Sequence, residues 1–201
     1  MKVLGVIPAR YKSTRFEGKP LALIDGVPML KRTYLQALQS SLLDDIVIAT
    51  EDARIYDFCV KEGMPVEMTS QSCLTGTDRL AEISETYDYD LYVNIQGDEP
   101  VIDPTSIEQI VNLYKSSEGK YEVYNLYKII TDQDEINSNT IVKVIVNALD
   151  EVMYMSRLPV PYSNGGNKSI HKQQIPVYGF TKNAFKVFST LSKTLNEQFE
   201  D

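Results

Sequence analysis

The sequence predicts a three-layer α/β domain whose central sheet is mostly parallel, and two observations carry this prediction. Short, continuous apolar runs recur through the first half of the chain, as is typical of strands buried on both faces of a parallel sheet. Segments with apolar residues at helical spacing alternate with these runs, which is the order that crossover helices produce. Because no repeat or linker interrupts the 201 residues, we expect residues 1–201 to form one domain.

The first expected strand covers residues 3–8, and Pro8 ends it because proline cannot donate to a sheet ladder. The other expected strands are residues 45–50, 66–68, 91–95, 122–130, 140–146, 152–155 and 176–180. The expected helices are residues 28–40, 52–62, a segment capped by Thr77 or Asp78 and running to about residue 86, 104–114 and 183–191. Residues 163–172, rich in Gly and Asn, have the composition of an exposed loop that contains His171.

Composition narrows the function classes. The formal net charge is −8, which argues against general nucleic-acid binding, where a basic face is usual. No apolar run approaches the ~20 residues of a membrane span, and Lys2 is followed at once by a strand-like segment, so we expect neither a membrane anchor nor a signal peptide. Two distant cysteines and one histidine make no disulfide framework and no zinc spacing, which favours a cytoplasmic protein.

A basic loop follows the first strand, against the acidic balance of the chain. It contains Arg10, Lys12, Arg15 and Lys19. Ligands of open α/β sheets bind beyond the carboxyl ends of the strands, and arginine and lysine are the side chains that bind phosphate. The loop is no Walker A motif, because Pro20 follows Lys19, and it contains no GxGxxG. A solvated basic turn is the alternative; we favour a nucleoside triphosphate.

Two further motifs follow in the chain. The segment Gln96-Gly97-Asp98-Glu99-Pro100 comes directly after a buried strand, where Asp98 could bind a divalent cation that also binds phosphates, or simply end the strand in a turn. The segment 75–79 (TGTDR) opens a helix and presents backbone N–H groups to a ligand, although an ordinary helix N-cap explains it equally well. The neighbouring basic loop favours the functional interpretation of both. His171 has no GxSxG partner, which argues against a serine hydrolase.

Taken together, IPARYKSTRFEGKPL, IVIATED, TGTDR, NIQGDEP and YMSRLPVP resemble the CMP-Kdo synthetase family. Its members are 3-deoxy-manno-octulosonate cytidylyltransferases, relatives of the CMP-sialic acid synthetases. The resemblance implies a nucleotidyltransferase domain with a Rossmann-like, mostly parallel mixed sheet and a three-layer α/β/α architecture. It implies CTP and a 2-keto sugar acid as substrates, Mg²⁺ as cofactor, a cytoplasmic homodimer, and a role in lipopolysaccharide biosynthesis. The anomeric hydroxyl of the sugar acid would attack the α-phosphorus of CTP and release pyrophosphate.

The resemblance also assigns residues. Those matched to the nucleotide are Pro8, Ala9, Arg10, Ser13, Arg15, Lys19, Thr75, Gly76, Thr77 and Asp78. Asp98 matches a magnesium ligand, whereas Gln96, Arg157 and Tyr178 match positions near the sugar acid. Nucleotidyl transfer depends on positioning and charge neutralisation, so Arg10, Lys19 and Asp98 are the expected catalytic residues, and no general base is assigned.

The chain departs from the family at three points. Gln174-Ile175-Pro176 occupies the place of a His-x-Gly, and the histidine that often precedes the TGT turn is absent, with Cys73 close to its position. The sequence given also lacks the family's C-terminal portion, which carries a second metal-binding aspartate. The expected alternatives are therefore a CMP-sialic-acid-type synthetase and a nucleotide-binding remnant without turnover.

Overall fold

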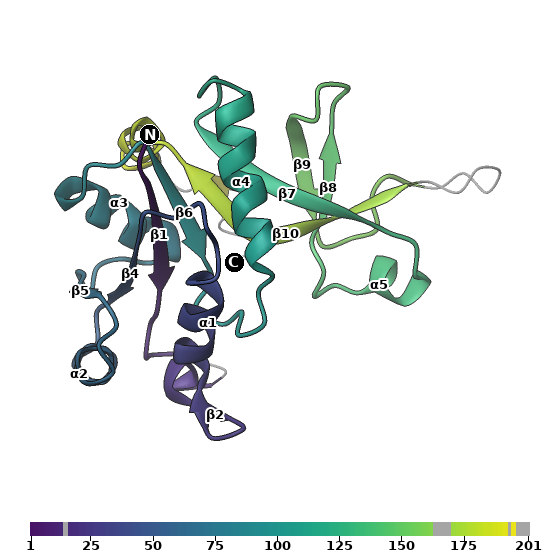
Figure 1. The fold of residues 1–201 in the computed structure, drawn as a ribbon. Coiled ribbons are helices and arrows are strands. Elements are labelled where there is room, and N and C mark those ends of the chain that lie inside the picture. The colour runs from purple at the N-terminus through teal and green to yellow at the C-terminus, as the bar shows by residue number, and fades with distance from the viewer. Residues whose placement is uncertain (14–15, 163–169, 193, 196–201) are drawn as a thin grey trace. The chain divides into compact units, whose positions relative to one another are not determined.

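The computed structural model describes residues 1–13, 16–162, 170–192 and 194–195 (Figure 1). Contacts along the backbone cluster into two compact units, Met1–Tyr124 with Val177–Asp201, and Asn125–Pro176. The sequence shows no boundary at these positions. Two compact units can belong to one domain, so the expectation that residues 1–201 form a single domain stays a prediction.

Four parallel strands form the centre of the first unit. They are β1 (Val3–Pro8), β4 (Asp45–Thr50), β5 (Val66–Met68) and β6 (Leu91–Ile95), and they lie in the order β5-β4-β1-β6. The end of β10 (His171–Phe180) pairs antiparallel with β6, where Val177 faces Ile95. The predicted bounds of all four parallel strands and the mixed, mostly parallel sheet are confirmed. The apolar runs of β1, β4 and β6 are buried on both faces, which leaves little choice of register or boundary.

Helices cover both faces of this sheet, as the three-layer prediction requires (Figure 1). They are α1 (Met29–Ala37), α2 (Ala53–Lys61), α3 (Gly76–Thr86), α4 (Pro104–Ser116) and α6 (Lys182–Phe188). On one face, Leu80 of α3 and Phe185 of α6 pack in a buried cluster with Leu4 of β1. On the other, Ile110 of α4 lies against Gly179 of β10. Among the described residues, no helix combines the length and apolar character needed to cross a bilayer.

Several helix ends differ from the sequence-based expectation. Helix α3 begins before the predicted cap, because Thr75 and Asp78 form a capping box and Thr75 is the N-cap. Helix α6 begins at Lys182 and ends at Phe188, three residues earlier than expected, with Thr181 as its N-cap. The apolar segment after the basic loop forms a short 3₁₀ helix, η1 (Lys19–Leu21), and a two-stranded hairpin of β2 (Leu23–Ile24) and β3 (Val27–Pro28).

The second unit contains most of β7 (Val123–Ile130), then α5 (Gln133–Asn137), β8 (Lys143–Val146), β9 (Val152–Ser156) and the first part of β10. Strands β8 and β9 are antiparallel, and Gln173 of β10 faces Lys143 of β8. Helix α5 was not predicted; Asp132 caps it by accepting hydrogen bonds from the N–H groups of Asp134 and Glu135.

The prediction of an exposed loop that contains His171 is wrong at its end. His171 begins β10 and is buried, and its Nδ1–H donates to the carbonyl oxygen of Val160 at 3.0 Å. The loop prediction failed because strand pairing with β8, a contact remote in sequence, decides where β10 starts. Residues 163–169 of the predicted loop lie outside the described residues.

Candidate functional site

The carboxyl ends of β1 and β6 approach each other closely at Gly97. A Cβ atom at this position would lie 2.6 Å from the carbonyl oxygen of Pro8, so the two backbones can meet only where residue 97 has no side chain. The buried hydroxyl of Thr33, on α1, lies 3.2 Å from the Gly97 carbonyl oxygen. The turn after β6 is therefore held between the end of β1 and α1. This packing fixes the backbone positions of Gln96 and Asp98.

A cavity of about 590 Å³ opens at these strand ends, wholly within the first unit. It brings together nine residues that the sequence assigns to a site: Pro8, Ala9, Arg10, Ser13, Lys19, Thr75, Gly76, Gln96 and Asp98. Phe16, Pro20, Met29, Leu74, Gly97 and Arg79 complete the lining. A polar cavity at the carboxyl ends of parallel strands is the usual place for a ligand in this type of sheet. The binding roles of the nine residues stay predictions.

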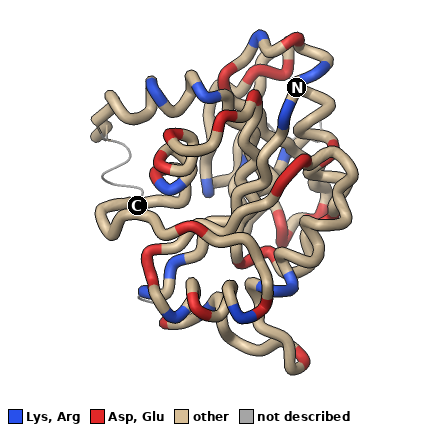
Figure 2. Tube along the Cα trace, turned by 60° about the vertical axis from the view of Figure 1, so that its left-hand side comes forward, with Lys and Arg blue, Asp and Glu red and all other residues tan. Residues whose placement is uncertain are grey.

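The Lys19 ammonium lies 2.6 Å from Oδ2 of Asp98, with both side chains partly exposed. Gly18, just before Lys19, has a φ of 70°, and its N–H donates to the Tyr11 carbonyl oxygen. A Cβ at Gly18 would lie 2.9 Å from the Tyr11 hydroxyl, and the guanidinium of Arg54 lies over the Tyr11 ring. Packing around Tyr11 thus turns the chain back at Gly18 and places Lys19 next to Asp98. Figure 2 shows acidic and basic residues interspersed along the chain trace.

Glu99 adds a second carboxyl group beside Asp98. Burial, and then the charge of Asp98, raise the pKa of Glu99 above its ordinary value, while Lys19 partly opposes this shift. Among the described residues, no group of three or more His, Cys, Asp or Glu side chains could hold a metal ion. The turn therefore offers one or two carboxylates to a cation, which Mg²⁺ accepts when phosphate oxygens and water supply its remaining ligands.

The start of α3 forms another wall of the cavity. A Cβ at Gly76 would lie 3.1 Å from the Pro8 ring, so this turn also packs tightly against the end of β1. Asp78 accepts hydrogen bonds from the N–H and the hydroxyl of Thr75, at 2.6 and 2.7 Å. Asp78 and Thr77 do not line the cavity. The structure thus shows a capping role for Asp78, and contact of Thr77 or Asp78 with a ligand stays a prediction.

Arg79 lines the cavity, although the sequence analysis assigns it no role. It is only 4% exposed, its Nη2 lies 2.7 Å from Oε2 of Glu51, and its Nη1 donates to the Thr69 hydroxyl at 2.6 Å. These partners follow β4 and β5, so Arg79 ties the start of α3 to two strand ends. The signal was present as the arginine of TGTDR, but burial and pairing depend on contacts remote in sequence.

Three assigned residues lie elsewhere. Tyr178 is on β10, opposite Asn94 of β6, and burial raises the pKa of its hydroxyl, but it does not line the cavity. Arg157 follows β9 in the second unit. Arg15 lies outside the described residues.

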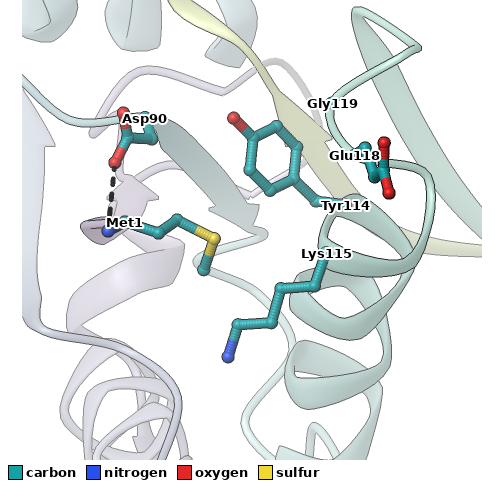
Figure 3. Close-up of a pocket in the computed structure, with 6 residues that line it drawn as sticks. All are labelled: Met1, Asp90, Tyr114, Lys115, Glu118 and Gly119. Atoms are coloured by element: carbon teal, nitrogen blue, oxygen red, sulfur yellow. Dashed lines mark ion pairs between the residues drawn. The ribbon is translucent and has the colours of Figure 1, made fainter.

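A second, shallower cavity of about 410 Å³ lies at the opposite ends of the same strands (Figure 3). Met1 and Asp90 precede β1 and β6, and the terminal amino group lies 3.7 Å from Oδ2 of Asp90. Tyr114 and Lys115 of α4 complete this side of the sheet, as the close-up shows. Because ligands of such sheets bind at the carboxyl ends, we assign no function to this cavity.

Comparison with known proteins identifies the family of the chain. The model of the cytidylyltransferase family matches residues 4–201. The 8-amino-3,8-dideoxy-manno-octulosonate cytidylyltransferase of Shewanella frigidimarina is 39% identical over 95% of this chain and 79% of the relative. The 3-deoxy-manno-octulosonate cytidylyltransferase of Fusobacterium nucleatum is 36% identical over 100% of this chain and 81% of the relative. A solved structure of CMP:2-keto-3-deoxy-manno-octonic acid synthetase complexed with CTP has a TM-score of 0.93 at 34% identity, over 100% and 82% of the two chains.

Proposed function

Because the chain belongs to the cytidylyltransferase family, we propose that it transfers CMP from CTP to a sugar acid of the 3-deoxy-manno-octulosonate class. The anomeric hydroxyl oxygen of the acid forms a bond to the α-phosphorus, and the bond from that phosphorus to pyrophosphate breaks. The observation that carries this proposal is the cavity at the ends of β1 and β6, where Arg10 and Lys19 lie with Asp98. Such transfer needs positioned charges more than covalent chemistry.

The basic loop is the part of the cavity suited to the triphosphate. Arg10 and Lys19 neutralise phosphate charge, Ser13 offers a hydroxyl, and Arg15 belongs to the same loop in sequence. The fixed turns at Pro8–Ala9 and at Thr75–Gly76 form another part of the lining, where rigid backbone groups can meet the edge of the base. The tight packing of Gly76 and Gly97 against Pro8 excludes side chains that would fill this space.

Mg²⁺ fits the donor set at the turn after β6. Asp98 would hold it, with Glu99 adjacent in sequence, and phosphate oxygens of CTP would complete its ligands. When bound, the ion would supply positive charge that stabilises the developing negative charge on the phosphates. Lys19 donates to Oδ2 of Asp98, so the pair orients the carboxylate before any cation binds.

Two sugar acids are candidates for the acceptor. The Shewanella relative is named for an 8-amino sugar acid and the Fusobacterium relative for the unsubstituted acid, and the two are similarly identical to this chain. We propose that Gln96, Tyr178 and Arg157 contact the acceptor, with Arg157 binding its carboxylate. Gln96 lines the cavity, and Arg157 carries an exposed guanidinium that makes no ion pair with any described carboxylate.

A panel assay tests this function directly. The protein is incubated with CTP and Mg²⁺ and, in turn, with 3-deoxy-manno-octulosonate, its 8-amino-8-deoxy form, and sialic acid, while pyrophosphate is measured. Release with either octulosonate supports the proposal and identifies the acceptor. Preference for sialic acid would replace it with the nine-carbon alternative. Calorimetric binding of Mg-CTP without turnover on any acid would mean that this chain is a nucleotide-binding module.

We further propose that the protein is a cytoplasmic homodimer that serves lipopolysaccharide biosynthesis. The exposed apolar side chains of β9 support the dimer: Val152, Met153 and Tyr154 are 52%, 68% and 52% exposed. A second copy of the chain is the occupant we propose for this strand. Light scattering of the eluted protein checks the mass, and a monomer at micromolar concentration would contradict the dimer.

A further inference from the structure

Lys143 is a fully buried lysine in the second unit. It lies at the start of β8, and its side chain is 0% exposed. Its ammonium group donates to three backbone carbonyl oxygens: those of Ser138 at 2.6 Å, Ile141 at 2.8 Å and Arg157 at 2.6 Å. A lysine has three N–H donors, so these bonds use all of them.

No described carboxylate pairs with Lys143, which distinguishes it from an ordinary buried ion pair. Burial, and then the charge of Arg157, lower the pKa of its amine below the ordinary value. Burying an unpaired charge is costly, and an apolar residue of similar length would fill the same space without that cost. What the buried lysine does, and an apolar residue would not do, is to link the backbone at Ser138, Ile141 and Arg157.

One of those positions belongs to Arg157. The Arg157 guanidinium donates through Nη1 to the Asn139 carbonyl oxygen at 3.1 Å, close in sequence to the two other carbonyls that Lys143 holds. Three residues on, the Val160 carbonyl oxygen accepts from the buried His171. The segment 157–160 is therefore held at both ends, while the Arg157 side chain stays exposed.

We propose that Lys143 is a positioning residue that fixes the backbone of Arg157 so that its guanidinium meets the carboxylate of the acceptor. This inference rests on the proposed function for the role of Arg157, but its structural part does not. Lys143 touches no substrate; it acts through the Arg157 carbonyl. A shift of about 1 Å in a substrate-binding group can cost about a hundredfold in rate, so such a hold has a measurable effect.

Hydrogen exchange tests the structural part without any substrate. Lys143→Met keeps the length of the side chain and removes all three donors. We expect faster exchange in peptides that cover residues 138–141 and 156–160, and unchanged exchange in peptides of β1 and β6. Lys128→Met, on the exposed face of β7, is the matched control. Unchanged exchange at 156–160 in the Lys143 variant would overturn the proposal.

A double-variant cycle tests the positioning role. Lys143→Met should raise KM for the sugar acid by about 10- to 100-fold and leave KM for CTP within about twofold. In an Arg157→Ala background, the same substitution should have almost no further effect on KM for the acid. A general loss of structure would instead lower kcat in both backgrounds. The proposal would be overturned if Lys143→Met raised KM for the acid by the same factor in both backgrounds, or if it left this KM unchanged.

Two controls keep the outcomes separate. If Lys143→Met does not fold, the same measurements are made on Lys143→Gln. Glutamine keeps N–H donors, but on a shorter side chain. If the unsubstituted protein turns over no sugar acid, the proposed function fails, and the exchange experiment still decides whether Lys143 fixes Arg157.

Discussion

Lys19 and Asp98 are 79 positions apart in the sequence, yet the Lys19 ammonium lies 2.6 Å from Oδ2 of Asp98. The pair joins the basic loop after β1 to the turn after β6. Both side chains are partly exposed, so the pair contributes little to folding, about 0–1 kcal/mol. Its value is in placing a cation and a carboxylate side by side at the position where we propose that the phosphates and Mg²⁺ bind.

Asp98→Ala should abolish turnover and leave the fold intact. The carboxylate is the proposed metal ligand, and we expect kcat to fall by at least about a hundredfold. The unfolding temperature should change little, because the lost ion pair is exposed. Pyrophosphate release and thermal unfolding are measured together, with Asp57→Ala, an exposed position on α2, as control. Turnover at the unsubstituted rate would mean that Asp98 only ends a strand.

Lys19→Met should weaken CTP binding. A charge-assisted contact to phosphate is worth about 1.5–3 kcal/mol, so we expect Kd for CTP to rise by roughly 10- to 100-fold. The difference between the two proteins should shrink as salt is raised, since screening weakens the contact. Titration calorimetry at low and high salt measures both effects. Lys61→Met, exposed at the end of α2, should bind CTP normally. Equal affinity at all salt concentrations would remove Lys19 from the triphosphate site.

The strands of the first sheet could be predicted from the sequence because their interactions are strong and local in pattern. The runs at residues 3–8, 45–50 and 91–95 are apolar at nearly every position, so burial on both faces is the only good outcome for them. The second unit was harder. Strand β10 begins with four polar residues, HKQQ, and its start at His171 depends on pairing with β8. Such pairing leaves no local signal.

The candidate site divides in the same way. Charged residues just after a strand reveal themselves in the sequence, which is how Arg10, Lys19 and Asp98 could be assigned to one place. The Arg79–Glu51 pair and the bonds of Lys143 could not be found, because an isolated charge in a sequence is normally solvated. Only the fold shows that these charges are buried and what they contact.

Gly97→Ala should damage both stability and turnover. The added Cβ would lie 2.6 Å from the Pro8 carbonyl oxygen, and backbone cannot move away cheaply. We expect a loss of about 1–3 kcal/mol in the free energy of unfolding and a lower kcat, because Asp98 follows directly. Gly76→Ala is the comparison: its contact is milder, 3.1 Å to the Pro8 ring, and alanine favours the helix there by up to about 1 kcal/mol. Denaturant unfolding should rank Gly97→Ala as clearly the worse; the reverse order would contradict the geometry.

Alkaline conditions should destabilise the protein partly through Tyr87. Its hydroxyl donates to Oε1 of Glu67 at 2.7 Å, and that bond, with burial, raises the pKa of Tyr87 to about 12 from an ordinary 10.0. The protonated form is thus favoured in the folded state, so the stabilisation is complete below pH 10 and is lost as the pH rises toward 12. Tyr87→Phe should show a shallower fall in unfolding free energy between pH 9 and 11. Tyr162→Phe, at an exposed tyrosine, should follow the unsubstituted protein. Identical slopes for all three proteins would contradict the prediction.

The buried pair of Arg79 and Glu51 should show strong coupling in stability. Their side chains are 5% and 13% exposed and meet at 2.7 Å, so removing one partner leaves the other charged and buried. We expect Arg79→Met and Glu51→Met each to cost about 3–5 kcal/mol, and the double variant to cost much less than their sum. Urea unfolding of the unsubstituted protein, the two single variants and the double variant measures the cycle.

The same variants test the cavity. Because Arg79 lines the cavity, CTP affinity should fall in both variants that lack it. Glu51→Met should lose affinity only because Arg79, without its partner, is no longer held in place. Additive stability losses would mean that the two charges are held independently, and unchanged CTP affinity without Arg79 would remove the start of α3 from the nucleotide site.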